Sequence, residues 1–255
     1  MSEILNKEQN WNGFRETYYD QYLDDVSPED AFLETFCVNN IADLSTRHNI
    51  EYGSLTRGID ICNGGVPINP AFMAPLFADN GRIEWADYGL PQIRRAQDLI
   101  IHREVPAGWL RHEAVMAEED PHWNGSMARA CILGKPTWHD IFSLPEETWE
   151  FATTGYGPES ITTDPGEWEE ATTRFFRSVK IGGIALMEYM INSTGYSSAG
   201  TEYHSMPITS EDVITVAKRY LKDIRVGQVF TSKAARAEDD PHTYDGMGAI
   251  LGIRT

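Results

Sequence analysis

Small and acidic residues at the ends of two predicted strands could bind a ligand that carries a ribose. Residues 57–62 form a short apolar run typical of a strand, and Asn63 and Gly64 supply a turn directly after it. A second predicted strand, 82–86, ends on Asp87. A glycine turn lets a ligand approach the backbone closely, and a carboxylate ending the next strand can accept hydrogen bonds from ribose hydroxyls. The order of these residues predicts an adenosine-type cofactor.

The turn differs from the dinucleotide-binding signature, which requires glycines at three fixed spacings. Cys62 stands at the first of these positions, and only Gly64 and Gly65 fill the turn. A glycine-poor turn that cradles no pyrophosphate favours S-adenosylmethionine over NAD or FAD. The alternative is an ordinary strand–helix–strand crossover in which Asp87 only ends a strand.

The elements around these residues predict an α/β protein with a largely parallel sheet. Strand and helix patterns alternate from residue 51 to about Leu221, which is typical of a sheet covered on both faces. Residues 224–230 and 247–253 follow without a helical pattern between them, so we expect them to pair as antiparallel strands. We predict an N-terminal helical cap over residues 1–50 and a single Rossmann-like domain over residues 51–255.

Helix starts are marked by a capping residue followed by proline or acidic residues. Such signals are found at 27–30, 164–167 and 209–212. Asn69 precedes a proline and predicts a further helix start, whereas residues 180–183 predict a tight turn before a strand. Residues 105–138 show the least legible pattern, with an exposed loop expected at 118–121.

Composition argues against several classes of protein. The net charge is −18 and no basic patch is visible, which disfavours a nucleic-acid partner. No apolar run approaches the roughly 18 residues of a membrane span, and the first residues lack the pattern of a signal peptide. The 3 cysteines are too far apart for a zinc site and suit a reducing compartment. We therefore expect a cytoplasmic monomer or homodimer with no membrane and no metal partner.

Taken together, the motifs resemble class I S-adenosylmethionine-dependent methyltransferases, and within them the nicotinamide and phenylethanolamine N-methyltransferase group with its bacterial relatives. The resemblance covers nearly the whole chain from Phe14 to Arg254 except residues 105–138, and it implies a mostly parallel sheet of seven strands with an antiparallel last strand. The motifs that carry it are Tyr18-Tyr19, residues 60–64, Asp87-Tyr88 with Gln92, and residues 184–208.

The resemblance also implies a set of cofactor-binding residues. Asp60 would contact the methionine part of S-adenosylmethionine, and Asp87 would accept hydrogen bonds from the ribose hydroxyls. Tyr88 would lie against the adenine, while Asp140 and Ile141 would bind the adenine amino group. The full set comprises Tyr18, Tyr19, Asp60, Asn63, Gly64, Asp87, Tyr88, Gln92, Asp140, Ile141, Thr154 and Tyr156.

Some of these residues have plainer alternatives. Tyr18-Tyr19 could be core aromatic residues of an N-terminal helix, and Asp140 could be a turn residue. Thr154 and Tyr156 would line the sulfonium in the resemblance, at the end of a predicted strand. Cys62 removes the first glycine of the family, and we expect this change to distort cofactor binding without abolishing it.

The resemblance places a methyl acceptor beside the sulfonium. Glu188, at the end of a predicted strand, corresponds to an acidic substrate-binding residue, and His204 could act as a base at neutral pH. Asn192, Tyr203 and Tyr244 are predicted polar contacts of the acceptor. The alternatives are a surface charge for Glu188 and a solvated loop residue for His204.

The predicted function is methyl transfer from S-adenosylmethionine to a small molecule, with an amine nitrogen first and an oxygen next, in specialised metabolism. One alternative is a methyltransferase fold recruited to cyclisation or another rearrangement. A second alternative is a cofactor-binding protein without turnover. The acidic stretch 239–242 is more typical of a solvated loop than of a metal site.

Overall fold

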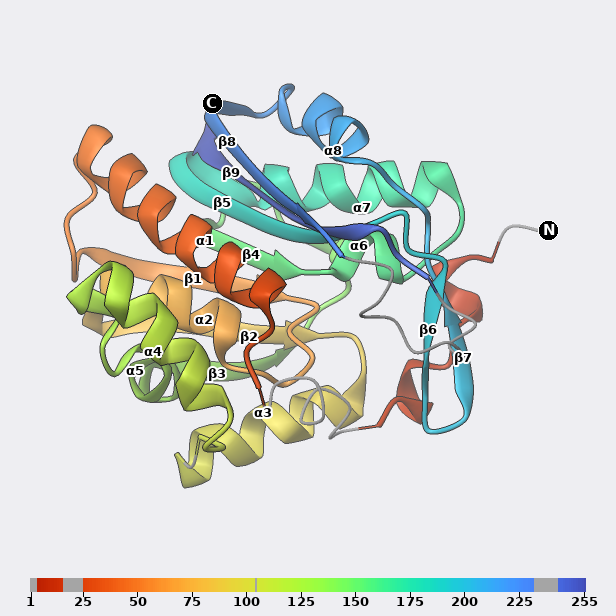
Figure 1. The fold of residues 1–255 in the computed structure, drawn as a ribbon, viewed down its shortest axis with the longest axis horizontal. Coiled ribbons are helices and arrows are strands. Elements are labelled where there is room, and N and C mark those ends of the chain that lie inside the picture. Colours follow the sequence, from red (N-terminus) through yellow and green to blue (C-terminus); the bar gives the residue numbers. More distant parts are fainter. Residues whose placement is uncertain (1–3, 16–24, 104, 232–242) are drawn as a thin grey trace.

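The fold is a seven-stranded sheet between two layers of helices (Figure 1). The computed structural model describes residues 4–15, 25–103, 105–231 and 243–255. The strand order is β3-β2-β1-β4-β5-β9-β8, in which β9 runs antiparallel to both of its neighbours. The strands are β1 (Leu55–Ile61), β2 (Phe77–Asp87), β3 (Gly134–Trp138), β4 (Trp149–Gly155), β5 (Val179–Ile191), β8 (Leu221–Phe230) and β9 (Gly246–Arg254). This arrangement confirms the predicted Rossmann-like sheet with an antiparallel last strand.

The helices divide between the two faces of the sheet. Buried side chains of α1 to α5 form one hydrophobic core with the sheet, and those of α7 and α8 form the other. The helices are α1 (Pro28–Arg47), α2 (Ile68–Met73), α3 (Leu90–His102), α4 (Trp109–Glu119), α5 (Ser126–Leu133), α6 (Gly157–Ser160), α7 (Pro165–Ser178) and α8 (Ser210–Ala217). The short strands β6 (Gly195–Ser198) and β7 (Thr201–His204) form a separate hairpin at the edge of the molecule (Figure 1).

Strand β5 shows how the sequence fills both cores. Ile184 and Leu186 belong to the core under α1, whereas Ala185 and Met187 belong to the core under α7. Successive side chains of a strand point to opposite faces, so an apolar run is buried on both sides. Strand β5 can therefore lie inside the sheet, where it presents its carboxyl end to the same edge as β1 and β4.

Three predicted helix starts are confirmed by their capping contacts. Ser27 and Asp30 form a capping box at the start of α1, and Thr209 and Asp212 form another at α8. Asp164 accepts a hydrogen bond from the Glu167 backbone N–H at 2.6 Å at the start of α7. Each side chain satisfies a backbone donor that has no partner inside its helix.

Two local predictions are wrong. Helix α2 begins at Ile68 after Pro67, so Asn69 is not its cap but a buried residue of the first turn. Residues 180–183 do not form a turn before a strand, because β5 already begins at Val179 and only shifts register there, with Gly182 at φ +84°. The residues with the least legible pattern, 105–138, supply α4, α5 and β3.

The described residues of the N-terminal part include short turns and one long helix. Before α1, the described residues contain two short 3₁₀ turns, η1 (Asn6–Glu8) and η2 (Trp11–Gly13). Helix α1 packs on β8 and β9 and so belongs to one layer of the sheet. Its side chains Leu33, Cys37 and Ile41 are buried in that core.

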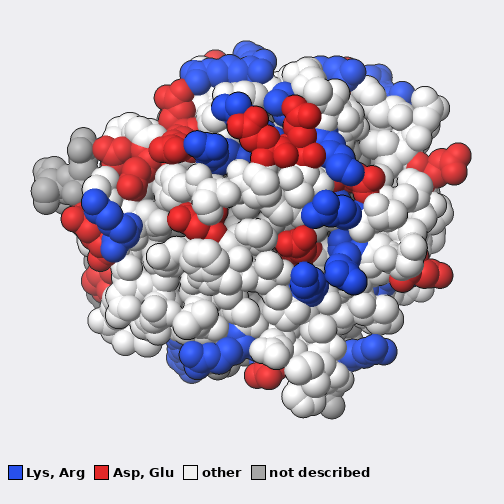
Figure 2. All heavy atoms as spheres, turned by 180° about the vertical axis from the view of Figure 1, so that it is seen from behind, with Lys and Arg blue, Asp and Glu red and all other residues white. Residues whose placement is uncertain are grey.

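The surface combines charges of both signs. On the face opposite to the view of Figure 1, Lys and Arg side chains lie among Asp and Glu and beside a broad uncharged area (Figure 2). Within the described ranges, no helix has the length and apolar character needed to cross a membrane. Cys37, Cys62 and Cys131 are free thiols.

Candidate cofactor and acceptor site

A cavity of about 440 Å³, here called the main cavity, lies at the carboxyl ends of β1, β2 and β4. Ligands of open α/β sheets bind at this edge, where the loops that follow parallel strands meet. Many of the predicted site residues lie on its wall. They are Gly64, Asp87, Tyr88, Gln92, Asp140, Ile141, Tyr156 and Tyr244.

The loop after β1 forms one side of the main cavity in a left-handed conformation. Cys62, Gly64 and Gly65 have φ angles of +57°, +67° and +76°. This region favours glycine, so Cys62 adopts a conformation that its side chain makes unfavourable. Asn63 holds the loop from behind, because its Oδ1 accepts from the Gly65 N–H at 3.0 Å and its Nδ2 donates to the Val66 carbonyl at 2.8 Å.

Asp87 joins the loops that follow β1 and β2. Its carboxylate accepts hydrogen bonds from the Gly64 N–H at 3.0 Å and from the Gly89 N–H at 2.8 Å. Burial raises the pKa of Asp87 to about 6, against the effect of these backbone donors. Each carboxylate oxygen keeps a lone pair for a further donor. The group is therefore oriented by the backbone and able to accept from two neighbouring hydroxyls.

Aromatic and polar side chains continue the wall beside Asp87. Tyr88 is 44% exposed and contacts Trp138, with a distance of 5.5 Å between ring centroids. Gln92 is buried at the start of α3, and its Nε2 has no hydrogen-bond partner among the described atoms. Asp140 accepts from the Phe142 N–H at 3.0 Å and so caps a short turn that also carries Ile141. Asp140 is thus both a turn residue and a wall residue.

Asp60 and Thr154 lie behind the wall of the main cavity. Asp60 is 1% exposed and accepts from Asn63 Nδ2 at 2.5 Å and from Thr153 Oγ1 at 2.8 Å. Burial raises the pKa of Asp60 to about 7. Thr154 is also buried, and its Oγ1 lies close to Gly157. Asp60 supports the loop through Asn63, and neither side chain lines the cavity.

A second cavity of about 80 Å³, the inner chamber, adjoins the main cavity. The two cavities share Asp30, Cys62, Gly155 and Tyr156 as lining residues. The other polar residues of the inner chamber are Glu34, Asn63, Asn69, His112 and Glu188. Its wall therefore combines residues from α1, α2, α4 and β5, which are far apart in the sequence.

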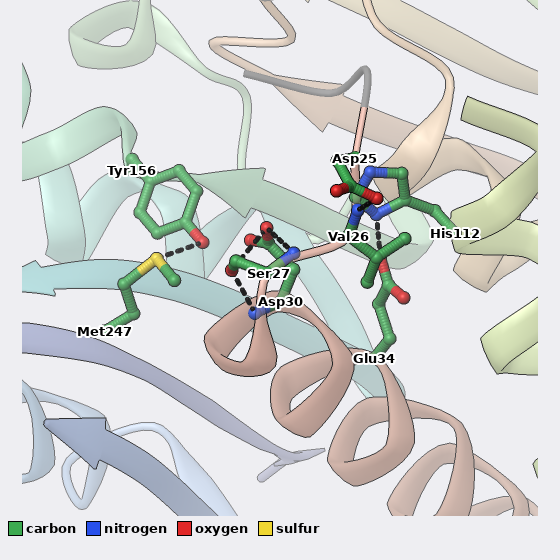
Figure 3. A network of polar contacts seen from close by, with 8 residues as sticks. All are labelled: Asp25, Val26, Ser27, Asp30, Glu34, His112, Tyr156 and Met247. Atoms are coloured by element: carbon green, nitrogen blue, oxygen red, sulfur yellow. Dashed lines mark hydrogen bonds and ion pairs between the residues drawn. The ribbon is translucent and has the colours of Figure 1, made fainter. Parts of the chain in front are cut away.

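Glu34 and His112 form a buried pair in the inner chamber. His112 Nδ1 lies in hydrogen-bond contact with Glu34 Oε1, while Glu34 Oε2 has no partner among the described atoms. Burial raises the pKa of Glu34 to about 7, although His112 lowers it. In the view of Figure 3, Asp30 lies between this pair and Tyr156, whose hydroxyl donates to Met247 Sδ at 3.3 Å.

Glu188 lies near the end of β5 and is 6% exposed. The amide of Asn69 is oriented so that Nδ2 donates to Glu188 Oε2 at 2.9 Å and Oδ1 accepts from the Gly155 N–H at 2.9 Å. Burial, with a smaller contribution from the nearby Glu34, raises the pKa of Glu188 to about 8. A cation that binds beside Glu188 would therefore strongly favour the ionised form of this carboxyl group.

The prediction that Glu188 and His204 face one pocket is wrong. His204 ends β7 of the separate hairpin, where its backbone N–H donates to Gln9 Oε1 at 3.0 Å, and it lines neither cavity. The sequence between them does not run on along the sheet edge. It enters the β6–β7 hairpin, where His204 pairs with Gly195; Gly195 lines the main cavity, whereas His204 on the partner strand does not.

Two further predicted acceptor contacts also lie off the cavity walls. Asn192 has φ +53° and donates to Asp245 Oδ2 at 2.8 Å. Tyr203 is fully buried, stacks on Tyr196 at 5.3 Å between ring centroids, and donates to the Asn10 carbonyl at 2.8 Å. Tyr203 thus supports Tyr196, which does line the main cavity. Tyr18, Tyr19 and the acidic stretch 239–242 lie outside the described residues.

Several wall residues were not predicted from the sequence. Trp11 and Phe14 precede α1 and close one side of the main cavity together with Tyr196. Asp30 and Glu34 are one helical turn apart, a spacing that places both on the same face of α1 and could have been recognised. His112 lies within residues 105–138, where the sequence shows no clear secondary-structure pattern. Within the described ranges, no group of His, Cys, Asp and Glu is arranged to hold a metal ion.

Comparison with known proteins identifies the fold. No protein-family model and no curated protein matches the chain. It is similar to the structure of an S-adenosylmethionine-dependent methyltransferase from Clostridium acetobutylicum ATCC 824, with a TM-score of 0.51 and 11% identity over 92% of this chain and 96% of that chain. The protein therefore has the class I methyltransferase fold, and at this identity the similarity concerns the fold alone.

Two other solved structures have lower scores. An S-adenosylmethionine-dependent methyltransferase from Aquifex aeolicus gives a TM-score of 0.48 and 12% identity over 95% of this chain and 100% of that chain. The N-methyltransferase NodS from Bradyrhizobium japonicum WM9, solved with S-adenosyl-L-homocysteine, gives 0.46 and 14% identity over 85% of each chain.

Proposed function

We propose that the protein transfers a methyl group from S-adenosylmethionine to a small-molecule acceptor, preferably an amine nitrogen. The observation that carries this proposal is the Asp87 carboxylate, fixed by the Gly64 and Gly89 N–H groups at the wall of the main cavity. A carboxylate at this position of a class I fold suits the two hydroxyls of a ribose. The order of the sequence motifs supports a relation to the nicotinamide and phenylethanolamine N-methyltransferase group, in a cytoplasmic enzyme.

The charge of the cavity walls also supports a sulfonium ligand. Asp30, Asp87 and Asp140 line the main cavity, and no Lys or Arg of the described part of the chain does so. S-adenosylmethionine carries a positive sulfur and would be attracted to such a wall, whereas its demethylated product would lack that attraction. Tyr88 and Ile141 offer apolar surfaces for the adenine, and Asp140 offers an acceptor for its amino group.

The residues of the chain would perform three tasks in this reaction. Bound S-adenosylmethionine supplies an activated methyl group, so the protein must chiefly align the acceptor lone pair and exclude water. Asp87 would orient the cofactor, and the aromatic wall around Trp11 and Tyr156 would exclude water. Glu188 would take a proton from the acceptor nitrogen, which then attacks the methyl carbon while the electron pair of the carbon–sulfur bond goes to sulfur.

Calorimetry followed by a turnover assay tests this proposal. We expect S-adenosylmethionine and S-adenosylhomocysteine to bind, and at least one member of a panel of amines, phenols and carboxylic acids to gain a methyl group detected by mass spectrometry. Absence of cofactor binding would contradict the assignment of the main cavity. Cofactor binding with rearranged but unmethylated products would instead favour recruitment of the fold to other chemistry.

A further inference from the structure

We propose that the inner chamber binds the ammonium group of the acceptor, so that the substrate is a small primary or secondary amine that enters as a cation. This inference rests on the proposed function and specifies its substrate class. The inner chamber adjoins the main cavity, because Cys62, Gly155 and Tyr156 line both. An amine could thus place its nitrogen in the chamber and keep the rest of the molecule in the main cavity.

Titratable groups face the chamber from all the elements that enclose it except α2, which contributes Ile68 and Asn69. Helix α1 contributes two carboxyl groups and α4 one imidazole, β5 contributes one carboxyl group, and the loops after β1 and β4 contribute a thiol and a phenol. These residues are Asp30, Glu34, His112, Glu188, Cys62 and Tyr156. No Lys or Arg of the described residues lines the chamber, so the carboxyl groups outnumber the one basic side chain.

A buried carboxyl oxygen without a partner distinguishes the chamber from an ordinary acidic cluster. Glu34 is 3% exposed and lines the chamber, and its Oε2 forms no hydrogen bond with described atoms. Buried polar groups are normally hydrogen-bonded, so such an atom is expected to meet a ligand or ordered water. Among the described residues, Glu188 receives a side-chain hydrogen bond from Asn69 alone, on one of its two oxygens. Two carboxyl groups are therefore available to donors inside the chamber.

The dimensions of the chamber suit an ammonium group. A volume of about 80 Å³ exceeds the roughly 10–15 Å³ needed for one water molecule and leaves room for a short alkylammonium group. Tyr156 adds an aromatic wall, and an aromatic face attracts organic cations. A neutral alcohol of the same shape would lack both the charge and the additional donors of an ammonium group.

Protonation should change when the amine binds. In the free protein burial raises the pKa of Glu34 to about 7 and that of Glu188 to about 8, so both hold protons for part of the time at neutral pH. An adjacent ammonium group favours their ionised forms. Binding should therefore release protons to the buffer near pH 7, and the affinity for the amine should rise from pH 6 to pH 8.

Titration of the unaltered protein gives the first test. We expect propylamine to bind at least 10-fold more tightly than 1-propanol, with S-adenosylhomocysteine present, and to release protons at pH 7 when buffers of different ionisation enthalpy are compared. Equal binding of the amine and the alcohol would overturn the proposal. Failure of every primary amine from methylamine to hexylamine to bind would also overturn it.

Paired variants give the second test. Glu34→Gln should weaken propylamine binding about 10-fold or more and leave the affinity for S-adenosylmethionine within 2-fold. Glu159→Gln is the matched control, because Glu159 is fully buried and lines neither cavity, and burial raises its pKa to about 7. The affinity of Glu159→Gln for propylamine should stay within 2-fold of that of the wild type. Equal binding by the wild type and Glu34→Gln would contradict the proposal.

The same titrations separate this inference from the proposed function. Loss of amine binding in Glu34→Gln with intact S-adenosylmethionine binding supports the inner chamber as the amine site. Methyl transfer to phenols alone, with no amine bound, overturns the chamber assignment but keeps the proposed function. If S-adenosylmethionine does not bind the wild type while propylamine does, the proposed function fails and the chamber assignment stands. Thermal unfolding of each variant identifies any that is misfolded, and the wild-type comparison of amine and alcohol then decides.

Discussion

The main cavity and the inner chamber hold carboxyl groups of the same chemistry in different surroundings. In the main cavity, Asp87 is held by two backbone N–H groups, so its direction is fixed before a ligand arrives. In the inner chamber, Glu188 has one amide partner, and one oxygen of Glu34 has none among the described atoms. The first arrangement suits recognition of a fixed pair of hydroxyls, whereas the second suits a group that brings its own positive charge.

Among the substitutions that test this comparison, we expect the largest effect, a loss of turnover, at Glu188. Glu188→Gln keeps the shape of the side chain but removes its ability to take a proton, so turnover should fall about 10²- to 10⁴-fold. The affinity for S-adenosylmethionine should stay within 2-fold, because the lost interaction belongs to the acceptor. His204→Ala serves as the comparison, since His204 lines neither cavity. Steady-state kinetics in which His204→Ala loses more activity than Glu188→Gln would contradict this division.

Asp87→Ala should give the next largest effect, now on the cofactor. The substitution removes the charged hydrogen-bond partner of the ribose hydroxyls. We expect it to make the binding free energy of S-adenosylmethionine less favourable by about 1–3 kcal/mol. Asp98→Ala, at an exposed position of α3, provides the control and should change nothing. Unchanged calorimetric affinity in a folded Asp87→Ala protein would remove the main cavity as the cofactor site.

The buried carboxyl groups predict an unusual dependence of stability on pH. Burial raises the pKa of Asp60 and Glu34 to about 7 and that of Glu188 to about 8. The folded state therefore binds more protons than the unfolded state between about pH 4 and pH 8, and the free energy of unfolding falls as pH rises through this range. We expect a lower melting temperature at pH 8 than at pH 5.5.

The variant Glu188→Gln checks the cause of this pH dependence. It removes one group that ionises unfavourably in the folded state, so the difference in melting temperature between pH 5.5 and pH 8 should become smaller. Glu84 and Glu150 act in the opposite sense, because their hydrogen-bond partners hold their pKa values below the ordinary value despite burial. Their contribution is lost only below about pH 4.5. A melting temperature that rises steadily to pH 8 would contradict the assignment of buried carboxyl groups.

Cys62→Gly should give the smallest effect. The φ angle of Cys62 is +57°, a region where glycine is unstrained, and Cys62 lines both cavities. We expect the variant to fold and to bind S-adenosylmethionine at least as tightly as the wild type. Cys131→Gly in helix α5 is the contrast, because glycine inside a helix destabilises by about 0.5–1 kcal/mol before any loss of packing. Clear loss of cofactor binding in Cys62→Gly would show that its side chain is needed there.

The sequence predicted the sheet and the rim of the main cavity because these depend on local patterns. Apolar runs, capping residues and strand ends are short-range signals, and they located Asp87 and Tyr88 at the end of their strand, whereas Asp140 was predicted from the family resemblance. Parallel strands then bring these ends to one edge without any further information.

The inner chamber could not be predicted in the same way. Its residues meet only through the packing of α1, α2 and α4 against the sheet, and apart from the one-turn spacing of Asp30 and Glu34 the sequence gives no local signal of that packing. Asn69 shows the difficulty: an asparagine before proline is typical of a helix cap, yet the helix starts one residue earlier and the side chain turns inward. His204 shows the reverse error: a suitable residue type lies on β7, whereas the residues of this hairpin that line the main cavity, such as Tyr196, belong to β6.

A crystal structure with S-adenosylhomocysteine would test the central claim most directly. We predict that the ligand occupies the main cavity, with both ribose hydroxyls within hydrogen-bond distance of Asp87 and the adenine between Tyr88 and Ile141. The sulfur should lie near Tyr156, on the side of the main cavity that adjoins the inner chamber. A ligand bound elsewhere, or a ribose turned away from Asp87, would contradict the account.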